Sequence, residues 1–564
     1  MIFDRYFLRL FQILLVLLFA ISASGAILGF AGIYHPLNEY IAVILIVAAV
    51  LPFVWKQSHI FKEHTSQPTL PRWSSMLLLL CGAVILLVLV FYPLVRWPLS
   101  HAGDWFPWDA GVYHFPKAVE LYRSTSIWDM SIAYADYPFG YESLLSFMLL
   151  LSGDLNLFGP LHGLLLLFFV SAFWLLGRKM TKLDGGLLLF LIAVLLLSDH
   201  FFQFLNLWRV FTLDIYTVGK NDLLLATSLL AALFYFYQIQ FSYKKGILGF
   251  ALASSLAASV KPNALYVLFP LWLFLFIRFY KQHLTSLLAH ALLLIPGLLW
   301  LVRNFIALGS YASADASRLA SWSIAANLGN PYFYQHIPKN LLLAGIVVLF
   351  EIILAFVDKK EHYWNAILSL VLLVAFISTP VTAYFGDTQT APNINWRFGE
   401  ALLVFLALLL WNDIALLLKK IKIGQPVSHV MAISLSIAAL LLAGWLLIDQ
   451  RAMLHSVPEN AFILHDQFKE SVGVDGYYSA YDYVQRHAHA AVVWVENGLP
   501  FYAYDSAFSN TISRQSPPDY VLGFNTDWFG DGDGGFPHLV EEFLADPAYQ
   551  VVYQDSQGIV LHRR

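Results

Sequence analysis

Carboxylates and aromatic rings are concentrated in one polar stretch that lies between two apolar segments. They are Asp104, Trp108, Asp109, Tyr113 and His114, followed by Tyr137 and Glu142. Carboxylates accept hydrogen bonds from hydroxyl groups, aromatic faces stack on apolar C–H surfaces, and a carboxylate beside a hydroxyl can act as a general base. This mixture suits a sugar. The alternative is an aromatic belt at a membrane surface, accompanied by solvated acids.

Four charged residues at the ends of apolar segments form a second candidate group: Asp222, Lys261, Arg303 and Arg397. Asp222 opens an apolar segment, where a carboxylate can simply favour the helix dipole. Lys261 stands between two short apolar segments, and a charge at membrane depth is a functional candidate unless it snorkels to the surface. The two arginines are expected at the outer face, against the positive-inside bias, which favours an anionic ligand.

The composition predicts the elements that must position these groups. The chain has 564 residues, of which 59% are hydrophobic and 12% charged; a soluble protein carries roughly 25% charged residues. Apolar runs of about 20 residues recur along the chain, and we expect about 12 to 14 membrane-spanning helices surrounded by lipid. A soluble enzyme, a disordered scaffold and a coiled coil are excluded. The net charge of −4 argues against a nucleic-acid partner.

The chain divides into two predicted domains. Residues 1–449 are expected to form a transmembrane domain with a catalytic outer loop at 96–140. Residues 450–564 carry mixed charges and strand-like patterns at Val492–Val495, Asp519–Phe524 and Gln550–His562, which predict a small α/β domain. Clusters of Lys and Arg place the N-terminus in the cytoplasm, and the loop and C-terminal domain outside, in a plasma or bacterial inner membrane.

Two transmembrane segments are predicted to be irregular. The apolar run at 141–153 is too short for an ordinary crossing. The runs 246–260 and 264–280 are interrupted by Lys261-Pro262-Asn263. Such irregular segments are tolerated where the backbone is buried in protein or lines a wet cavity.

Several short motifs in this order resemble the GT-C superfamily of integral-membrane glycosyltransferases. Trp108–Pro116 is similar to the family's D-x-x-x-Y-H-x-P, and Tyr137–Glu142 is similar to its Y-P-P-G-x-E. Five further matches follow in the family's order: Asn221-Asp222, Lys261-Pro262-Asn263, Arg303-Asn304, Gly329-Asn330-Pro331 and Trp396-Arg397-Phe398. Each motif is short, and only their order and spacing together are specific. Relatives include protein O-mannosyltransferases, lipid A aminoarabinose transferase and oligosaccharyltransferases.

The resemblance implies inverting transfer of a sugar from a polyprenyl-phosphate donor to a hydroxyl of a glycan, lipid or protein acceptor. Asp109 takes the role of general base, and Asp104 is the rival. Many relatives have an Asp-Glu pair where Ala110 follows Asp109 here, so His114 or Glu142 is expected to supply the second polar contact. The expected donor-phosphate ligands are Lys261, Arg303 and Arg397, and the expected substrate contacts are Trp108, Tyr113, Tyr137 and Asp222.

Two other classes of function stay open. One is a ligase or polymerase of surface polysaccharide, which uses the same kind of donor. The other is a lipid or sugar transporter, whose inverted repeats and mid-span charges we do not find in this sequence. No cofactor is required by the sequence, although Asp104, Asp109 and Asp136 could together hold a divalent cation.

Overall fold

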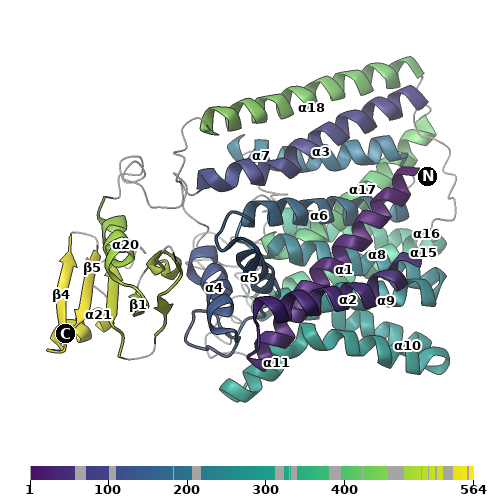
Figure 1. The fold of residues 1–564 in the computed structure, drawn as a ribbon. Helices are drawn as coiled ribbons and strands as arrows, with labels where there is room; N and C mark the ends of the chain where they lie inside the picture. Colours follow the sequence, from purple (N-terminus) through teal and green to yellow (C-terminus); the bar gives the residue numbers. More distant parts are fainter. Residues whose placement is uncertain are drawn as a thin grey trace.

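The computed structural model shows a bundle of apolar helices with a small mixed sheet at one end (Figure 1). It describes residues 2–56, 71–100, 109–181, 183–205, 218–311, 323–328, 331, 339–357, 359–379, 396–421, 425–454, 475–496, 498–505, 507–514, 517–524, 538–555 and 558–564.

The bundle is built from long helices whose side chains are mostly apolar. They are α1 (Ile2–Ala31), α2 (Pro36–Lys56), α3 (Arg72–Ser100), α6 (Phe158–Met180), α7 (Gly185–Leu205), α8 (Asp222–Phe241), α9 (Tyr243–Val260), α10 (Ala264–Ala291), α11 (Ile295–Leu308), α15 (Lys339–Val357), α16 (Lys359–Ser378), α17 (Glu400–Ile421) and α18 (Gln425–Leu454). Shorter helical elements connect them: η2 (Ala110–His114), α4 (Phe115–Ser124), α5 (Gly140–Ser152), η3 (Leu292–Leu294), α13 (Ile324–Asn327) and η4 (Trp396–Gly399).

This is a polytopic helical membrane protein. Six apolar stretches in the described part are long enough to cross a bilayer: Asp4–Ala31, Pro36–Lys56, Arg72–Phe91, Phe158–Met180, Asp222–Phe241 and Ala264–Leu308. Shorter apolar stretches lie in α5, α7, α15, α16 and α18. The span count of 12 to 14 stays a prediction.

Most of the irregular helices follow the sequence pattern. Helix α5 is a 13-residue helix, as predicted. The break between α9 and α10 falls at Lys261-Pro262-Asn263, where proline disfavours the helical conformation of the preceding residue. The apolar run that begins at 264 was predicted to end near 280. The structure has a kink close to that point: within α10 the backbone of His283 is non-helical, and a second helical piece continues to Ala291.

Helix packing divides the bundle into two parts. Helices α3, α7 and α18 lie side by side along one edge (Figure 1). Helix α8 is the central helix. It contains an apolar stretch that is long enough to cross a membrane and is completely buried, and the helix packs on α6, α9 and α17. Its first residue is Asp222, so the position of this carboxylate is set by a helix that is enclosed by protein.

The C-terminal unit contains a five-stranded sheet in the order β2-β1-β3-β5-β4. The strands are β1 (Val492–Glu496), β2 (Thr511–Ile512), β3 (Tyr520–Phe524), β4 (Tyr549–Gln554) and β5 (Gly558–Arg563), with α20 (Asp475–His487), η5 (Pro500–Ala503) and α21 (His538–Ala545). Strand β1 pairs parallel with β2 and β3, and β5 pairs antiparallel with β3 and β4. The predicted strands and closing hairpin are confirmed.

Close packing of α11 on α9 gives a first prediction. A Cβ atom at Gly297 would overlap the Ser255 carbonyl group, whose carbon atom would lie 2.9 Å away. Gly297→Ala should therefore destabilise the protein by about 1–3 kcal/mol, as overpacking does, even though alanine favours helix by about 1 kcal/mol. The midpoint of thermal unfolding in detergent should fall.

Gly345→Ala in α15 is the matched control, because no atom lies within 4 Å of the Cβ that it would introduce. It should leave the midpoint unchanged or raise it. Equal midpoints for the two variants would show that α9 and α11 can separate at little cost.

Candidate functional site at the first loop

The first loop meets the bundle at Asp109. This partly buried residue precedes η2, a single π-type turn that leads directly into α4. Turns of this kind are rare and recur at functional sites. The five residues of η2 are all buried, and the Asp109 carboxylate acts electrostatically on His114, the last of them.

His114 and Glu142 form the buried centre of the site. Nδ1 of His114 lies 2.8 Å from Oε1 of Glu142, and each side chain is only 1% exposed. Burial lowers the pKa of the His114 ring, so the ring is neutral at neutral pH. A neutral imidazole held by a carboxylate has a fixed orientation, and it supports the turn that presents Asp109.

Lys117 lies in the same network. Its Nζ is 3.4 Å from Oε1 of Glu142 and donates to the carbonyl oxygens of Tyr137 at 3.3 Å and Pro138 at 3.0 Å. The ammonium group also lies 4.1 Å from the centre of the Phe139 ring. The side chain is fully buried, and burial lowers the pKa of Lys117 to about 8.

Arg303 binds the backbone of the first loop through hydrogen bonds. Its guanidinium donates to the carbonyl oxygens of Ile127 at 3.2 Å, Tyr137 at 3.3 Å and Ala135, and to Oδ1 of Asn304 at 2.8 Å. The side chain is completely buried. Its hydrogen bonds therefore fix the path of the loop backbone, while its charge adds positive potential beneath the site.

Aromatic rings line the loop side of this network. Tyr113 contacts the rings of His114, Tyr134 and Tyr137 at centroid distances of 4.1, 4.8 and 6.3 Å. Tyr141 meets the His114 ring edge-on at 5.3 Å. The predicted substrate residues Tyr113 and Tyr137 thus lie beside the predicted polar pair.

A second charged pair lies across Tyr141. Lys261 forms an ion pair with Oδ1 of Asp222, and its ammonium group is 4.7 Å from the centre of the Phe398 ring. Both Glu142 and Asp222 act electrostatically on Tyr141. Phe398 follows Arg397 in η4, so this short element is the one that contacts Lys261.

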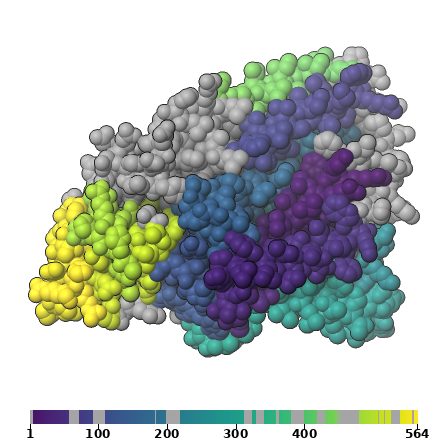
Figure 2. All heavy atoms as spheres, in the orientation of Figure 1, coloured from purple at the N-terminus to yellow at the C-terminus, as the bar shows by residue number. Residues whose placement is uncertain are grey.

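The C-terminal unit packs directly on α4 (Figure 2). Arg123 donates to the Ser509 carbonyl oxygen at 2.9 Å and to Oγ1 of Thr511 at 3.0 Å. The Tyr504 hydroxyl donates to Glu120 at 2.9 Å in a buried contact. Apolar contacts continue towards the η2 turn. The rings of Phe115 and Phe501 have their centroids 5.1 Å apart, and Leu499 lies against Gly111.

The structure brings together most of the predicted site residues that it describes. His114, Glu142, Tyr113 and Tyr137 meet around η2, and Asp109 opens that turn. Asp222 and Lys261 form one pair, whereas Arg303 binds the backbone of the first loop, so these two cations have different partners. Asp104, Trp108, Gly329, Asn330 and the side chain of Arg397 lie outside the described residues.

Sequence reasoning did not identify two buried polar residues of the site, Lys117 and Asn304. Asn304 was noted only as part of a motif. Asn304 donates to the carbonyl oxygens of Asp136 at 2.7 Å and Tyr311 at 2.8 Å. The available signal was that Lys117 follows His114 by three residues, which places both on one face of a helix.

The contact between Arg123 and the C-terminal unit gives a second prediction. Arg123→Ala removes the hydrogen bonds that Arg123 donates to Ser509, Thr511 and Glu120. Each buried group left without a partner lowers stability by about 1–3 kcal/mol. Amide hydrogen exchange in β2 and α4 should become faster.

Arg486→Ala is the control, because Arg486 is 66% exposed and pairs with Asp482 on the surface of α20. Such pairs contribute little, and exchange should not change. If Arg123→Ala also leaves exchange unchanged, the remaining contacts, among them the Tyr504–Glu120 hydrogen bond, are sufficient to hold the two units together.

The buried ammonium group of Lys117 gives a third prediction. Its pKa is about 8 in the folded protein and near 10.5 when unfolded. Between these values the unfolded chain binds more protons, so this residue makes stability rise with pH; below pH 8 both states are charged and the slope vanishes. From pH 8 to pH 10 the wild type should gain about 2 kcal/mol relative to Lys117→Met.

The free energy of unfolding in detergent, compared between the two proteins at each pH, measures this difference. Lys245→Met, at an exposed position of α9, should show no pH-dependent difference from the wild type. A constant difference for Lys117→Met would mean that Lys117 keeps its ordinary pKa.

Comparisons with known proteins give a distant likeness to solved structures. No protein-family profile matches the chain, and no curated protein matches it. Among solved structures, the chain is similar to ArnT from Cupriavidus metallidurans, whose crystal structure was determined with undecaprenyl phosphate bound. The identity is 14% and the TM-score is 0.46, over 86% of this chain and 97% of that one. At this level of similarity we base the function on the chain's own residues.

Proposed function

We propose that this protein transfers a sugar from a polyprenyl-phosphate donor to an acceptor hydroxyl at the membrane face where the first loop lies. The observation that carries the proposal is the position of Asp109. Its carboxylate opens a π-type turn that is held from beneath by the buried His114–Glu142–Lys117 network. A fixed, partly exposed carboxylate next to the apolar region of a membrane protein has the properties of a general base for a lipid-linked substrate.

The base must approach the acceptor hydroxyl to within hydrogen-bond distance. The acceptor oxygen attacks the anomeric carbon, its proton passes to Asp109, and the bond to the phosphate oxygen breaks. The configuration is inverted because the transfer occurs in one displacement.

The leaving phosphate requires fixed positive charge where negative charge develops. Lys261 is our main candidate, and Arg397, which precedes Phe398 in η4, is the second. Asp222 keeps the Lys261 ammonium group in place through the ion pair. Arg303 contributes through its charge and through the loop carbonyl groups that it holds, so we assign it to positioning the loop as well as to the donor site.

The aromatic side chains complete the proposed substrate site. Tyr113 and Tyr137 present ring surfaces beside the polar network, and such surfaces stack on the C–H faces of sugars. The donor's prenyl chain would lie among the apolar helices. In the cell the N-terminus would face the cytoplasm, and the loop and the C-terminal unit would face outward.

The competing functions make different predictions in one assay. A transferase releases polyprenyl phosphate from labelled donor only when acceptor is present. A transporter moves a donor analogue between leaflets of a proteoliposome without acceptor. A ligase or polymerase releases polyprenyl phosphate and also lengthens the glycan by more than one sugar unit.

Replacement of the proposed base gives the fourth prediction. Asp109→Asn keeps the shape of the side chain and loses the base, so transfer in a membrane assay should fall by about 10²–10⁴ while donor binding survives. Asp104→Asn should lower the rate of transfer by a smaller factor. The matched control is Asp129→Asn in the same loop, where the carboxylate accepts hydrogen bonds from Ser131; it should retain most activity.

The order of the two main effects decides the assignment. If Asp104→Asn abolishes transfer and Asp109→Asn does not, Asp104 is the base. If neither carboxylate matters with the true donor, the glycosyltransferase proposal fails, and an aromatic belt becomes the better account of the loop.

A further inference from the structure

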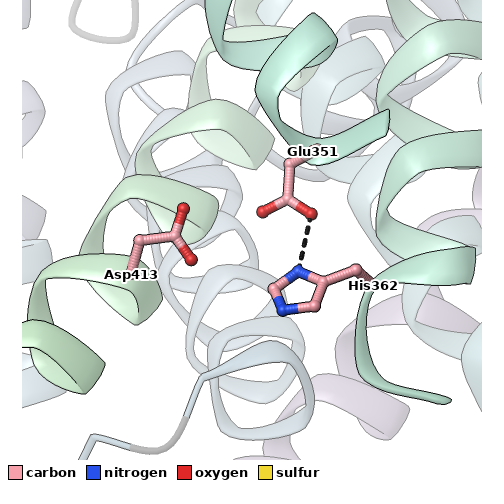
Figure 3. Close-up of side chains that lie close together, drawn as sticks. All are labelled: Glu351, His362 and Asp413. Atoms are coloured by element: carbon pink, nitrogen blue, oxygen red, sulfur yellow. Dashed lines mark hydrogen bonds and ion pairs between the residues drawn. The ribbon is translucent and has the colours of Figure 1, made fainter. Parts of the chain in front are cut away.

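Three acid–base side chains from three helices meet inside the bundle: Glu351 of α15, His362 of α16 and Asp413 of α17 (Figure 3). Each side chain offers one atom that could bind a metal ion, and these three atoms all lie within 4.8 Å of one another. Nδ1 of His362 is 3.0 Å from Oε2 of Glu351. The Asp413 carboxylate points towards this pair (Figure 3).

The cluster is remote from the proposed catalytic region. Helix α17 follows η4, which lies beside Lys261, and Asp413 is the fourteenth residue of that helix. At 1.5 Å per residue this is about 20 Å along the helix axis. The Tyr237 hydroxyl, in the last turns of α8, donates to Asn365 of α16 at 2.5 Å. The cluster therefore lies near the opposite end of α8 from Asp222.

Glu351 carries an unsatisfied oxygen. The residue is fully buried, and its Oε2 atom pairs with His362. Its Oε1 atom is buried and has no hydrogen-bond partner among the residues that the structure describes, and it points towards the Asp413 side of the cluster (Figure 3). A buried carboxylate oxygen without a donor is costly, so this atom indicates a ligand between the three side chains.

The charges of the cluster identify the kind of ligand. The Glu351 carboxylate lies in the electrostatic field of the Asp413 carboxylate, and the two groups, when both are ionised, place two negative charges among apolar helices. Charge at this depth is expensive unless it is compensated. One divalent cation would neutralise both carboxylates, and it would bind the free oxygen of Glu351.

We propose that Glu351, His362 and Asp413 bind one divalent transition-metal ion, Zn²⁺ or Mn²⁺. Imidazole favours Zn²⁺ over Mg²⁺ and Ca²⁺, and carboxylates suit Mn²⁺ as well. Metal–ligand bonds of about 2.0–2.2 Å place ligands roughly 3–4.4 Å apart, so a small rotation of the side chains completes the site. His362 exchanges its bond to Glu351 for the metal, and water fills the remaining coordination position.

The bound ion would join three helices rather than take part in sugar transfer. Asp413 is only partly buried, which provides a path for entry. The ligands come from α15, α16 and α17, so the ion would fix the end of the bundle that faces away from the first loop. The proposal does not depend on the proposed function.

Metal binding by the full-length protein in detergent tests the proposal. After chelator treatment and dialysis, calorimetric titration with Zn²⁺ and with Mn²⁺ should show one ion bound per chain for at least one of them. Loss of a supporting group around a metal weakens binding by about 10–100-fold. Glu351→Gln and Asp413→Asn each remove a direct ligand and should weaken binding at least about tenfold. The ion should also raise the thermal midpoint of the wild type but not of Asp413→Asn.

Glu39→Gln is the matched control. Glu39 is a completely buried carboxylate of α2 that accepts a hydrogen bond from Ser24 at 2.6 Å. This variant should bind the ion as tightly as the wild type. Asp413→Asn, at the least buried ligand, keeps the test valid if Glu351→Gln fails to fold.

Three results would overturn the proposal. The first is a wild type that binds neither ion at millimolar concentration. The second is unchanged affinity in a folded Asp413→Asn protein. The third is equal loss of affinity in Glu39→Gln, which would place the binding elsewhere in the protein.

Discussion

The burial of two cations beneath the first loop is the constraint on which the site depends. Lys117 and Arg303 are fully buried, and both engage the carbonyl oxygen of Tyr137. Both also approach the face of the Phe139 ring. A buried charge without partners would cost several kcal/mol, so the loop backbone must follow the path that supplies these carbonyl groups. The position of Glu142, three residues after Phe139, follows from that path.

The same loop connects the bundle to the C-terminal unit. Helix α4 carries Lys117, which contacts Glu142 in the bundle, and Glu120 and Arg123, which contact the C-terminal unit. Because η2 precedes α4 directly, a displacement of either the bundle or the C-terminal unit moves Asp109. The C-terminal unit is thus part of the framework of the site, although none of its residues belongs to the proposed catalytic group.

The sequence predicted those features that depend on local chain properties. Apolar length predicted the bundle, Pro262 predicted the break after α9, and alternating strand patterns predicted β1, β3 and the closing hairpin. The expectation that His114 or Glu142 supplies a second polar contact came from the family resemblance, and their direct contact was not predicted. The other features of the site depend on contacts with backbone groups and on how deeply each side chain is buried. The partners of Arg303 are mostly carbonyl oxygens, which every residue carries, so no residue type reveals them.

The Glu351 cluster could not be recognised for a different reason. Its members are separated by 11 and 51 positions in the sequence, and helix periodicity assigns a residue to a face without saying which helices meet there. Each charge within an apolar run was nevertheless a visible sign, because such charges are rarely retained without a role. Helix α8 relates this cluster to the catalytic region: Asp222 begins it, and Tyr237 contacts α16 near its end. A helix enclosed on all sides can shift only if its neighbours shift, so packing around the cluster also limits the position of Asp222 and, through the ion pair, of Lys261.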